Sequence, residues 1–216
     1  MNKKKRKNSF YTAVTIILLS ITFVIYSCSS NEYEYTNESN KLIDSIAQSD
    51  EFWEFERNSK LLSDKFQAYT STLSEEEYNK LMVKLNDDDY IEEFIKKSNL
   101  EQELHLMNEA KENLLLYTGF ARLSEDERIA LFRQYAESHE STGKTRIKTR
   151  TEGGDANSCE AKRQAAYAQA KANYDNDIIN CRKESSTNSC YAQALSRYER
   201  NQRAAEREYK SCIQGN

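Results

Sequence analysis

The sequence contains no proline and only five glycines among its 216 residues. These two residue types mark the turns of sheet proteins and interrupt helices, so their scarcity leaves long stretches free to be helical. Strand-like alternation of apolar and polar residues is also scarce, whereas apolar residues recur at spacings of three and four. We therefore expect an all-α protein.

Residues that carry catalysis are also few. The chain has two histidines, His105 and His139, and neither begins a metal motif such as HExxH. The patterns SxxK and GxSxG and glycine-rich phosphate loops are missing or lack their context. Two of the many carboxylates could meet in a cleft and act on glycans, but the sequence pairs none of them. We predict no enzymatic activity, no catalytic residue, no metal and no cofactor.

The first 30 residues differ from the rest of the chain. Five of the first seven residues are Lys or Arg, and an apolar run from residue 10 to about residue 26 ends at Ser27-Cys28. This order is typical of a segment that enters the export machinery with its basic end left in the cytoplasm. An uncleaved signal anchor stays open as an alternative, because about 17 apolar residues can just span a bilayer.

The end of this segment, "IYSC", resembles the lipobox of bacterial lipoproteins, which has an aliphatic residue three places before the cysteine and a small residue directly before it. Tyr26, two places before Cys28, is bulkier than is usual at that position, which is the most tolerant one. The resemblance implies that Cys28 is acylated and that residues 1–27 are removed as a signal peptide. It implies a cell-envelope protein held by membrane lipid, which we expect in the outer membrane on its periplasmic or surface face. Two or three acyl chains anchor a protein stably where one does not. The polar residues 28–37 are predicted to form a tether.

Residues 38–138 are predicted to form an acidic helical bundle. Residues 28–140 hold 12 cations and 26 acids, and Phe52, Phe55, Leu62 and Phe66 make an apolar stripe at helical spacing. Ser74 with Glu77, and Ser124 with Glu127, form capping-box patterns that mark helix starts. Short connections favour antiparallel neighbours. The expected helices cover residues 38–48, 50–71, 75–85, 88–98, 100–120 and 125–138.

Two features of this body have competing interpretations. The stretch "NDDDY", residues 86–90, could suggest a calcium loop, but its aspartates are consecutive and no glycine follows, so an acid-rich helix start is favoured. Trp53 and the tyrosines could line a glycan or peptide groove. Because aromatic residues at helical spacing usually belong to a core, we expect Trp53 inside the bundle.

Residues 139–158 are predicted to be a basic, flexible linker. Glycines gather here and apolar periodicity stops. Lys144, Arg146, Lys148 and Arg150 alternate, so in an extended chain they form a cationic strip that could meet phosphate or the acidic body. A solvated linker is the default. No specific nucleic-acid binding is expected.

The four distal cysteines are spaced symmetrically, with gaps of 22, 9 and 22 residues between Cys159, Cys181, Cys190 and Cys212. Each 22-residue gap spans about 33 Å of helix, which is too far for a disulfide within one helix. Pairing Cys159 with Cys190 needs parallel helices and an almost fully stretched link. The pairs Cys181–Cys190 and Cys159–Cys212 remain, so residues 159–213 are predicted to form an antiparallel helical hairpin.

A four-cysteine zinc site is the competing chemistry, but zinc favours cysteines two to four residues apart and none of these gaps is that short. Disulfides agree with export to an oxidising compartment. The sequence thus predicts a small helical bundle followed by a long disulfide-linked hairpin.

From these features we expect a membrane-anchored envelope lipoprotein that acts as a non-enzymatic interaction or spacer module, with an unidentified envelope protein as partner. Two alternatives stay open. One is an antagonistic or protective protein of the inhibitor or effector type. The other is a glycan-binding lipoprotein.

Overall fold

The computed structural model describes residues 37–140, 154–181 and 188–214. Residues 39–216 form one compact unit, and of the other unit, residues 1–38, only the first two residues of helix α2 are described. The described residues form eight α-helices and one short 3₁₀ helix, with no strand among them. Cys28 and the strip formed by Lys144, Arg146, Lys148 and Arg150 lie outside the described residues. The all-α prediction is confirmed.

The helices lie close to the positions that the sequence predicts. They are α2 (Asn37–Ala47), α3 (Asp50–Thr70), α4 (Glu75–Val83), α5 (Asp88–Ser98), α6 (Glu101–Tyr117), η1 (Phe120–Arg122), α7 (Glu125–Glu140), α8 (Gly154–Asn180) and α9 (Asn188–Gln214). The agreement is close because short-range signals fix most of these boundaries.

Side chains at the helix starts supply those signals. The Ser74 hydroxyl accepts a hydrogen bond from the Glu77 backbone N–H, and the Glu77 carboxylate accepts one from the Ser74 backbone N–H. Ser124 and Glu127 make the same two bonds. In the "NDDDY" stretch Asp87 caps α5 by accepting from the Tyr90 N–H, as expected for a helix start. Each cap satisfies backbone donors that have no partner within the helix.

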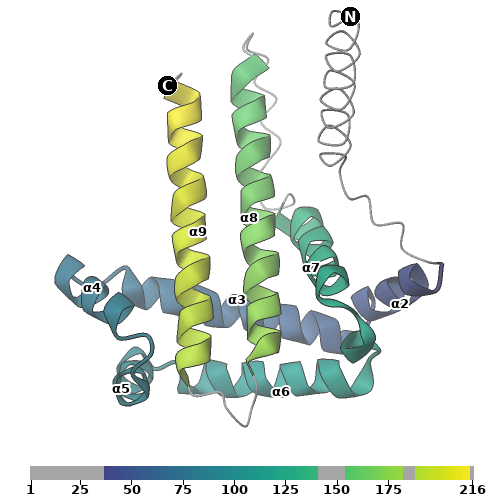
Figure 1. Ribbon diagram of the computed structural model, residues 1–216, viewed down its shortest axis with the longest axis horizontal. Coiled ribbons are helices and arrows are strands. Elements are labelled where there is room, and N and C mark those ends of the chain that lie inside the picture. The colour runs from purple at the N-terminus through teal and green to yellow at the C-terminus, as the bar shows by residue number, and fades with distance from the viewer. Residues whose placement is uncertain (1–36, 141–153, 182–187, 215–216) are drawn as a thin grey trace, which may run out of the picture. The chain divides into compact units, whose positions relative to one another are not determined.

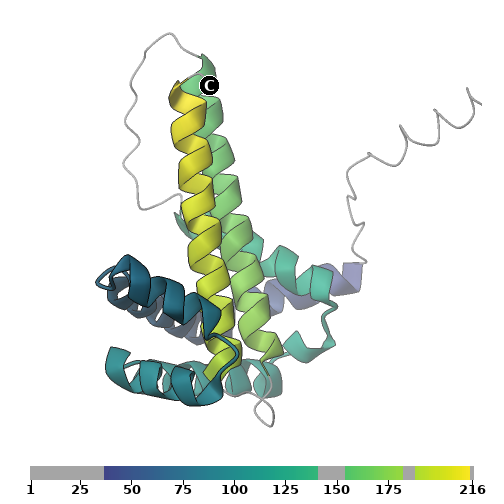
Figure 2. The same cartoon turned by 60° about the vertical axis from the view of Figure 1, so that its left-hand side comes forward.

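Helices α8 and α9 run side by side in opposite directions, and α7 lies along α8 (Figures 1 and 2). Helices α3 and α6 pack on each other, and α5 contacts the lower part of α9. The end of the hairpin that carries Cys159 and Cys212 extends beyond α3, whereas the turn end meets α6 (Figure 1). The bundle and the hairpin therefore share one packed interior at the turn end.

Aromatic side chains fill the interior between α3 and α7. The Phe132 ring lies 5.9 Å from that of Phe52 and 5.5 Å from those of Phe55 and Phe120, measured between centroids. All four are fully buried. Each buried ring contributes roughly 1.5–3 kcal/mol of transfer free energy, so this cluster stabilises the packing of α3 against α7.

The disulfides are Cys159–Cys212 and Cys181–Cys190, each with 5.8 Å between its Cα atoms. These are the pairs that helix geometry predicts, and they close the hairpin at both ends. Helix α8 begins at Gly154, five residues before Cys159, so it extends into the stretch predicted as linker. Helix propagation adds one hydrogen bond per residue, and no proline stops it here.

None of the helices in the described part of the chain has both the length and the apolar character needed to cross a bilayer.

Candidate binding groove

A groove of about 1230 Å³ lies between α3 and the outer halves of α8 and α9, with the end of α7 at one side. Polar and aromatic side chains dominate its wall. Among the described residues that line it, seven are Lys or Arg, five are Asp or Glu, three are Gln, three are Tyr, and Ala136 is the single aliphatic residue. Such a wall differs from the mostly apolar lining of ordinary small-molecule pockets.

Buried charges form the floor of the groove. The Lys171 ammonium on α8 lies 2.7 Å from the Glu56 carboxylate on α3 and also bonds Asp175 one turn further along α8. The Ser59 hydroxyl donates to Asp175, and the Tyr174 hydroxyl donates to the Ser59 carbonyl at 3.2 Å. Glu56 and Asp175 are 2% and 0% exposed. This cluster connects α8 to α3 in the interior.

The carboxyl groups of Glu56 and Asp175 share the single Lys171 ammonium, so one of these two carboxyl groups keeps a proton at neutral pH. Burial, together with the charge of Asp175, raises the pKa of Glu56 to about 8. Burial likewise raises the pKa of Asp175, although the Lys171 charge and hydrogen bonds oppose the shift. Burial alone would lower the pKa of Lys171, but the charges of Asp175 and Glu56 reverse this and raise it. At pH 7 the cluster therefore has Lys171 charged and Glu56 neutral.

Contacts between the helices hold the walls of the groove in place. The Gln67 side chain on α3 donates to Gln202 on α9 at 2.7 Å, and the Thr70 hydroxyl donates to Glu199 at 3.2 Å. Between the hairpin helices, Arg163 lies 3.2 Å from the Glu206 carboxylate. Together with the Cys159–Cys212 disulfide these contacts fix the outer half of the hairpin, so the groove is preformed.

An aromatic cluster stands at the α7 end of the groove. The rings of Tyr135 and His139 stack with 4.2 Å between centroids, and both residues line the groove. The Trp53 ring meets both edge-on, at 5.3 Å and 4.9 Å. Trp53 is 43% exposed, so the expectation that it lies inside the bundle is wrong. The rings of Tyr135 and His139 on α7 hold Trp53 at the surface. The spacing of apolar residues along α3 could not show this, because it does not show which helix packs beside Trp53.

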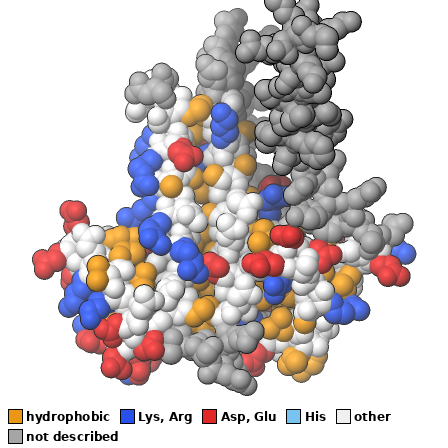
Figure 3. Space-filling model, in the orientation of Figure 1, with side chains coloured by type: hydrophobic (Ala, Val, Ile, Leu, Met, Phe, Trp, Pro, Cys, Tyr) orange, Lys and Arg blue, Asp and Glu red, His pale blue; other side chains and the backbone are white. Residues whose placement is uncertain are grey.

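A row of cations follows one side of α9 for 13 residues, or about 20 Å. Figure 3 shows Lys and Arg side chains along this edge of the hairpin, whereas Asp and Glu side chains gather over α4 and α5. The members are Arg197, Arg200, Arg203, Arg207 and Lys210, and all are exposed. Arg203, Arg207 and Lys210 line the groove, whereas Arg197 and Arg200 do not.

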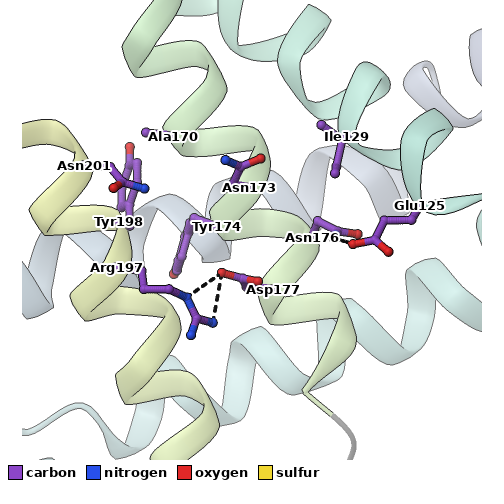
Figure 4. A pocket seen from close by; sticks show the side chains of 10 residues that line it. All are labelled: Glu125, Ile129, Ala170, Asn173, Tyr174, Asn176, Asp177, Arg197, Tyr198 and Asn201. Atoms are coloured by element: carbon purple, nitrogen blue, oxygen red, sulfur yellow. Dashed lines mark hydrogen bonds and ion pairs between the residues drawn. The ribbon is translucent and has the colours of Figure 1, made fainter. Parts of the chain in front are cut away.

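A smaller hollow of about 260 Å³ lies between α7, α8 and α9 (Figure 4). Asn176 donates to Glu125 across it at 3.0 Å, and Arg197 lies 3.0 Å from Asp177. Tyr174 and Tyr198 stack with 4.8 Å between their centroids, and Tyr198 borders both this hollow and the groove. Because its charged side chains, Glu125, Asp177 and Arg197, already bond to other side chains that line it, this hollow is a weaker candidate for a ligand.

The hairpin turn has its own buried cation. The Lys111 ammonium on α6 donates to the Cys181 carbonyl at 2.6 Å and to the Tyr191 hydroxyl, and its side chain lies over the Tyr191 ring. Burial raises the pKa of Tyr191 to about 12, so its hydroxyl stays protonated. A positive charge at the carboxyl end of α8 also suits the helix dipole.

The sequence-predicted sites fall into two groups. The four distal cysteines are paired on the hairpin, whereas Cys28 and the strip from Lys144 to Arg150 lie outside the described residues. Sequence reasoning missed the Glu56–Lys171–Asp175 cluster and Lys111. One signal was available, since Lys171 and Asp175 stand four residues apart on the buried side of an alanine-rich helix.

A scan against models of known protein families finds no match, and searches of curated proteins and of solved structures find none either. Within the described ranges, no three His, Cys, Asp or Glu side chains come close enough together to hold a metal ion.

Proposed function

We propose that this chain is a lipid-anchored protein of the bacterial cell envelope that acts as a non-enzymatic binding module. The observation that carries the proposal is the preformed groove between α3 and the disulfide-closed hairpin. A rigid groove binds with little loss of conformational entropy, which favours recognition. The "IYSC" motif at Cys28 supports the lipid anchor, and the two disulfides are consistent with an oxidising compartment.

The chemistry of the groove supports binding rather than catalysis. Its deepest titratable groups, Lys171 and Glu56, bond to each other, and Lys171 also bonds the buried Asp175, so that the cluster connects α8 to α3. A catalytic acid or base has to reach a bound substrate, and these groups are engaged in holding the hairpin. In this proposal the cluster positions the walls, and the exposed side chains above it make the contacts.

Two experiments test the proposal. Mass spectrometry of the protein extracted from membranes should find acyl chains on Cys28 and no trace of residues 1–27. Crosslinking in intact envelopes should capture a ligand or partner, and capture should fall when Arg207 and Lys210 on the groove wall are changed to Gln. The Arg200→Gln variant is the matched control, because Arg200 lies on the same helix outside the groove. An unacylated Cys28 would refute the lipid anchor. If the Arg207→Gln and Lys210→Gln variant captured as much ligand or partner as the wild type, the proposed binding site would be refuted.

A further inference from the structure

The groove carries an excess of positive charge. Seven Lys or Arg side chains line it against five acids, and Glu56 is neutral at pH 7. Because Asp175 balances the charge of Lys171, six cations face four acids outside the buried cluster. Arg57 and Lys60 stand on the α3 wall, and Arg203, Arg207 and Lys210 stand on the α9 wall. Like charges on facing walls repel each other unless an anion lies between them.

The wall cations differ in whether an acid already pairs with them, since Lys60 bonds Asp64 and Arg203 bonds Glu199. Within the described residues, Arg207 and Lys210 are exposed and have no ion-pair partner. The Arg57 guanidinium meets Glu54 only at 3.8 Å, and 72% of its side chain is exposed. An arginine fork can bind a carboxylate or phosphate through two parallel hydrogen bonds. The groove therefore fits an elongated ligand with several acidic groups.

The remaining wall chemistry distinguishes a glycan from a peptide. Peptide ligands use apolar pockets for their side chains or an exposed strand edge for their backbone. Here Ala136 is the single aliphatic lining residue, and no strand occurs among the described residues. Gln164 and Gln202 instead bring amide groups to the wall. The Gln164 Nε2 donates to Glu160 and the Gln202 Oε1 accepts from Gln67, which leaves the Gln164 oxygen and the Gln202 nitrogen to bond sugar hydroxyls.

The aromatic cluster at the α7 end adds a surface for sugar rings. Tyr135 and His139 line the groove, and Trp53 lies directly beside them with 43% of its surface exposed. Aromatic rings present a flat apolar face with polar atoms at its rim, which suits the C–H face of a pyranose. We propose that the groove binds an acidic oligosaccharide, with its acid groups on the α3 and α9 cations and a sugar ring at the aromatic end. This inference rests on the proposed function.

Calorimetric titration of the full chain in detergent micelles tests the ligand class with three defined probes. Tetragalacturonate carries four carboxylates on a sugar chain, maltotetraose has the same length without charge, and tetraglutamate carries the charges on a peptide. Tetragalacturonate should bind at least about tenfold more tightly than either of the others, and its affinity should fall as salt rises.

Variants place the binding in the groove. The double change Arg207→Gln and Lys210→Gln should weaken tetragalacturonate binding about tenfold, whereas Arg200→Gln should change it less than about twofold. These side chains are exposed, and unchanged circular dichroism would show that each variant folds.

Three results would overturn the inference. They are no heat of binding with tetragalacturonate, an affinity for tetraglutamate equal to that for tetragalacturonate, or a loss of tetragalacturonate affinity in the Arg200→Gln variant as large as in the double variant. If envelope crosslinking still depends on the groove variant while no acidic sugar binds, the ligand class is wrong and the binding module stands. If tetragalacturonate binds selectively and through the groove, the inference is supported independently of the lipid anchor.

Discussion

Replacing Glu56 with Gln tests the protonation of the buried cluster. In the folded protein Glu56 has a pKa of about 8, compared with 4.5 for a free side chain. The folded state therefore holds a proton that the unfolded state has released between these two pH values. Stability must then fall as pH rises from about 5 to 8, at up to about 1.4 kcal/mol per pH unit.

This slope gives the expected size of the effect. Between pH 5 and pH 8 the wild-type chain should lose roughly 3–4 kcal/mol of unfolding free energy. In the Glu56→Gln variant the side chain is neutral at every pH, and its amide can accept from Lys171 and donate to Asp175. The variant should therefore match the wild type within about 1 kcal/mol at pH 5 and exceed it by about 3 kcal/mol at pH 8.

Urea unfolding with the disulfides intact measures these differences, with circular dichroism and the fluorescence of Trp53, the only tryptophan, as probes. The exposed Glu54→Gln change on the same helix is the control and should shift stability by less than about 0.5 kcal/mol at each pH. The exposed carboxylates of Glu92 and Glu93 have lowered pKa values, because each accepts a hydrogen bond from a lysine, so they act below this pH window. A wild-type profile that is flat from pH 5 to 8, or a variant less stable than wild type at pH 8, would show that Glu56 is ionised and refute the reasoning.

Three further changes test other parts of the structure. Replacing Cys159 and Cys212 with Ser should destabilise the chain by about 4 kcal/mol in thermal unfolding, because the 53-residue separation sets the loop entropy that the bridge removes; an unchanged melting temperature would contradict this. Lys111→Met should cost about 2 kcal/mol in urea unfolding, because the Cys181 carbonyl loses its buried charged donor, and a neutral result would show that water replaces the ammonium. Gly119→Ala should destabilise by about 1–3 kcal/mol, since the added Cβ would lie 2.4 Å from the Leu42 side chain, and equal stability would show that Leu42 moves aside without penalty.

Much of the fold follows from local signals in the sequence. The Ser74 and Ser124 capping boxes and the Asp87 cap are made as the spacing predicts, so the starts of α4, α7 and α5 were predictable. The symmetric cysteine gaps predicted both disulfides for a similar reason, because the rise of a helix excludes the other pairings. The domain boundaries at 38–138 and 159–213 stay a prediction, although residues 39–216 pack as one unit.

The candidate site was much less predictable. Trp53 stands at core spacing on α3, yet its partners Tyr135 and His139 on α7 hold it at the surface. Helical periodicity shows which residues share a face but not which element covers that face. The sequence shows the basic residues of α9 as good helix formers. Three of them, Arg203, Arg207 and Lys210, form a groove wall only because α3 packs opposite them.

The sequence by itself determined that the chain is helical, where most helices begin and which cysteines pair, because these depend on contacts within a helix or across one short turn. Only the tertiary structure decided that Lys171 lies buried against Glu56, 115 residues away, and that a groove forms above them. The physical reason is that burial and pairing of charges depend on the packing of separate helices, which no local pattern records.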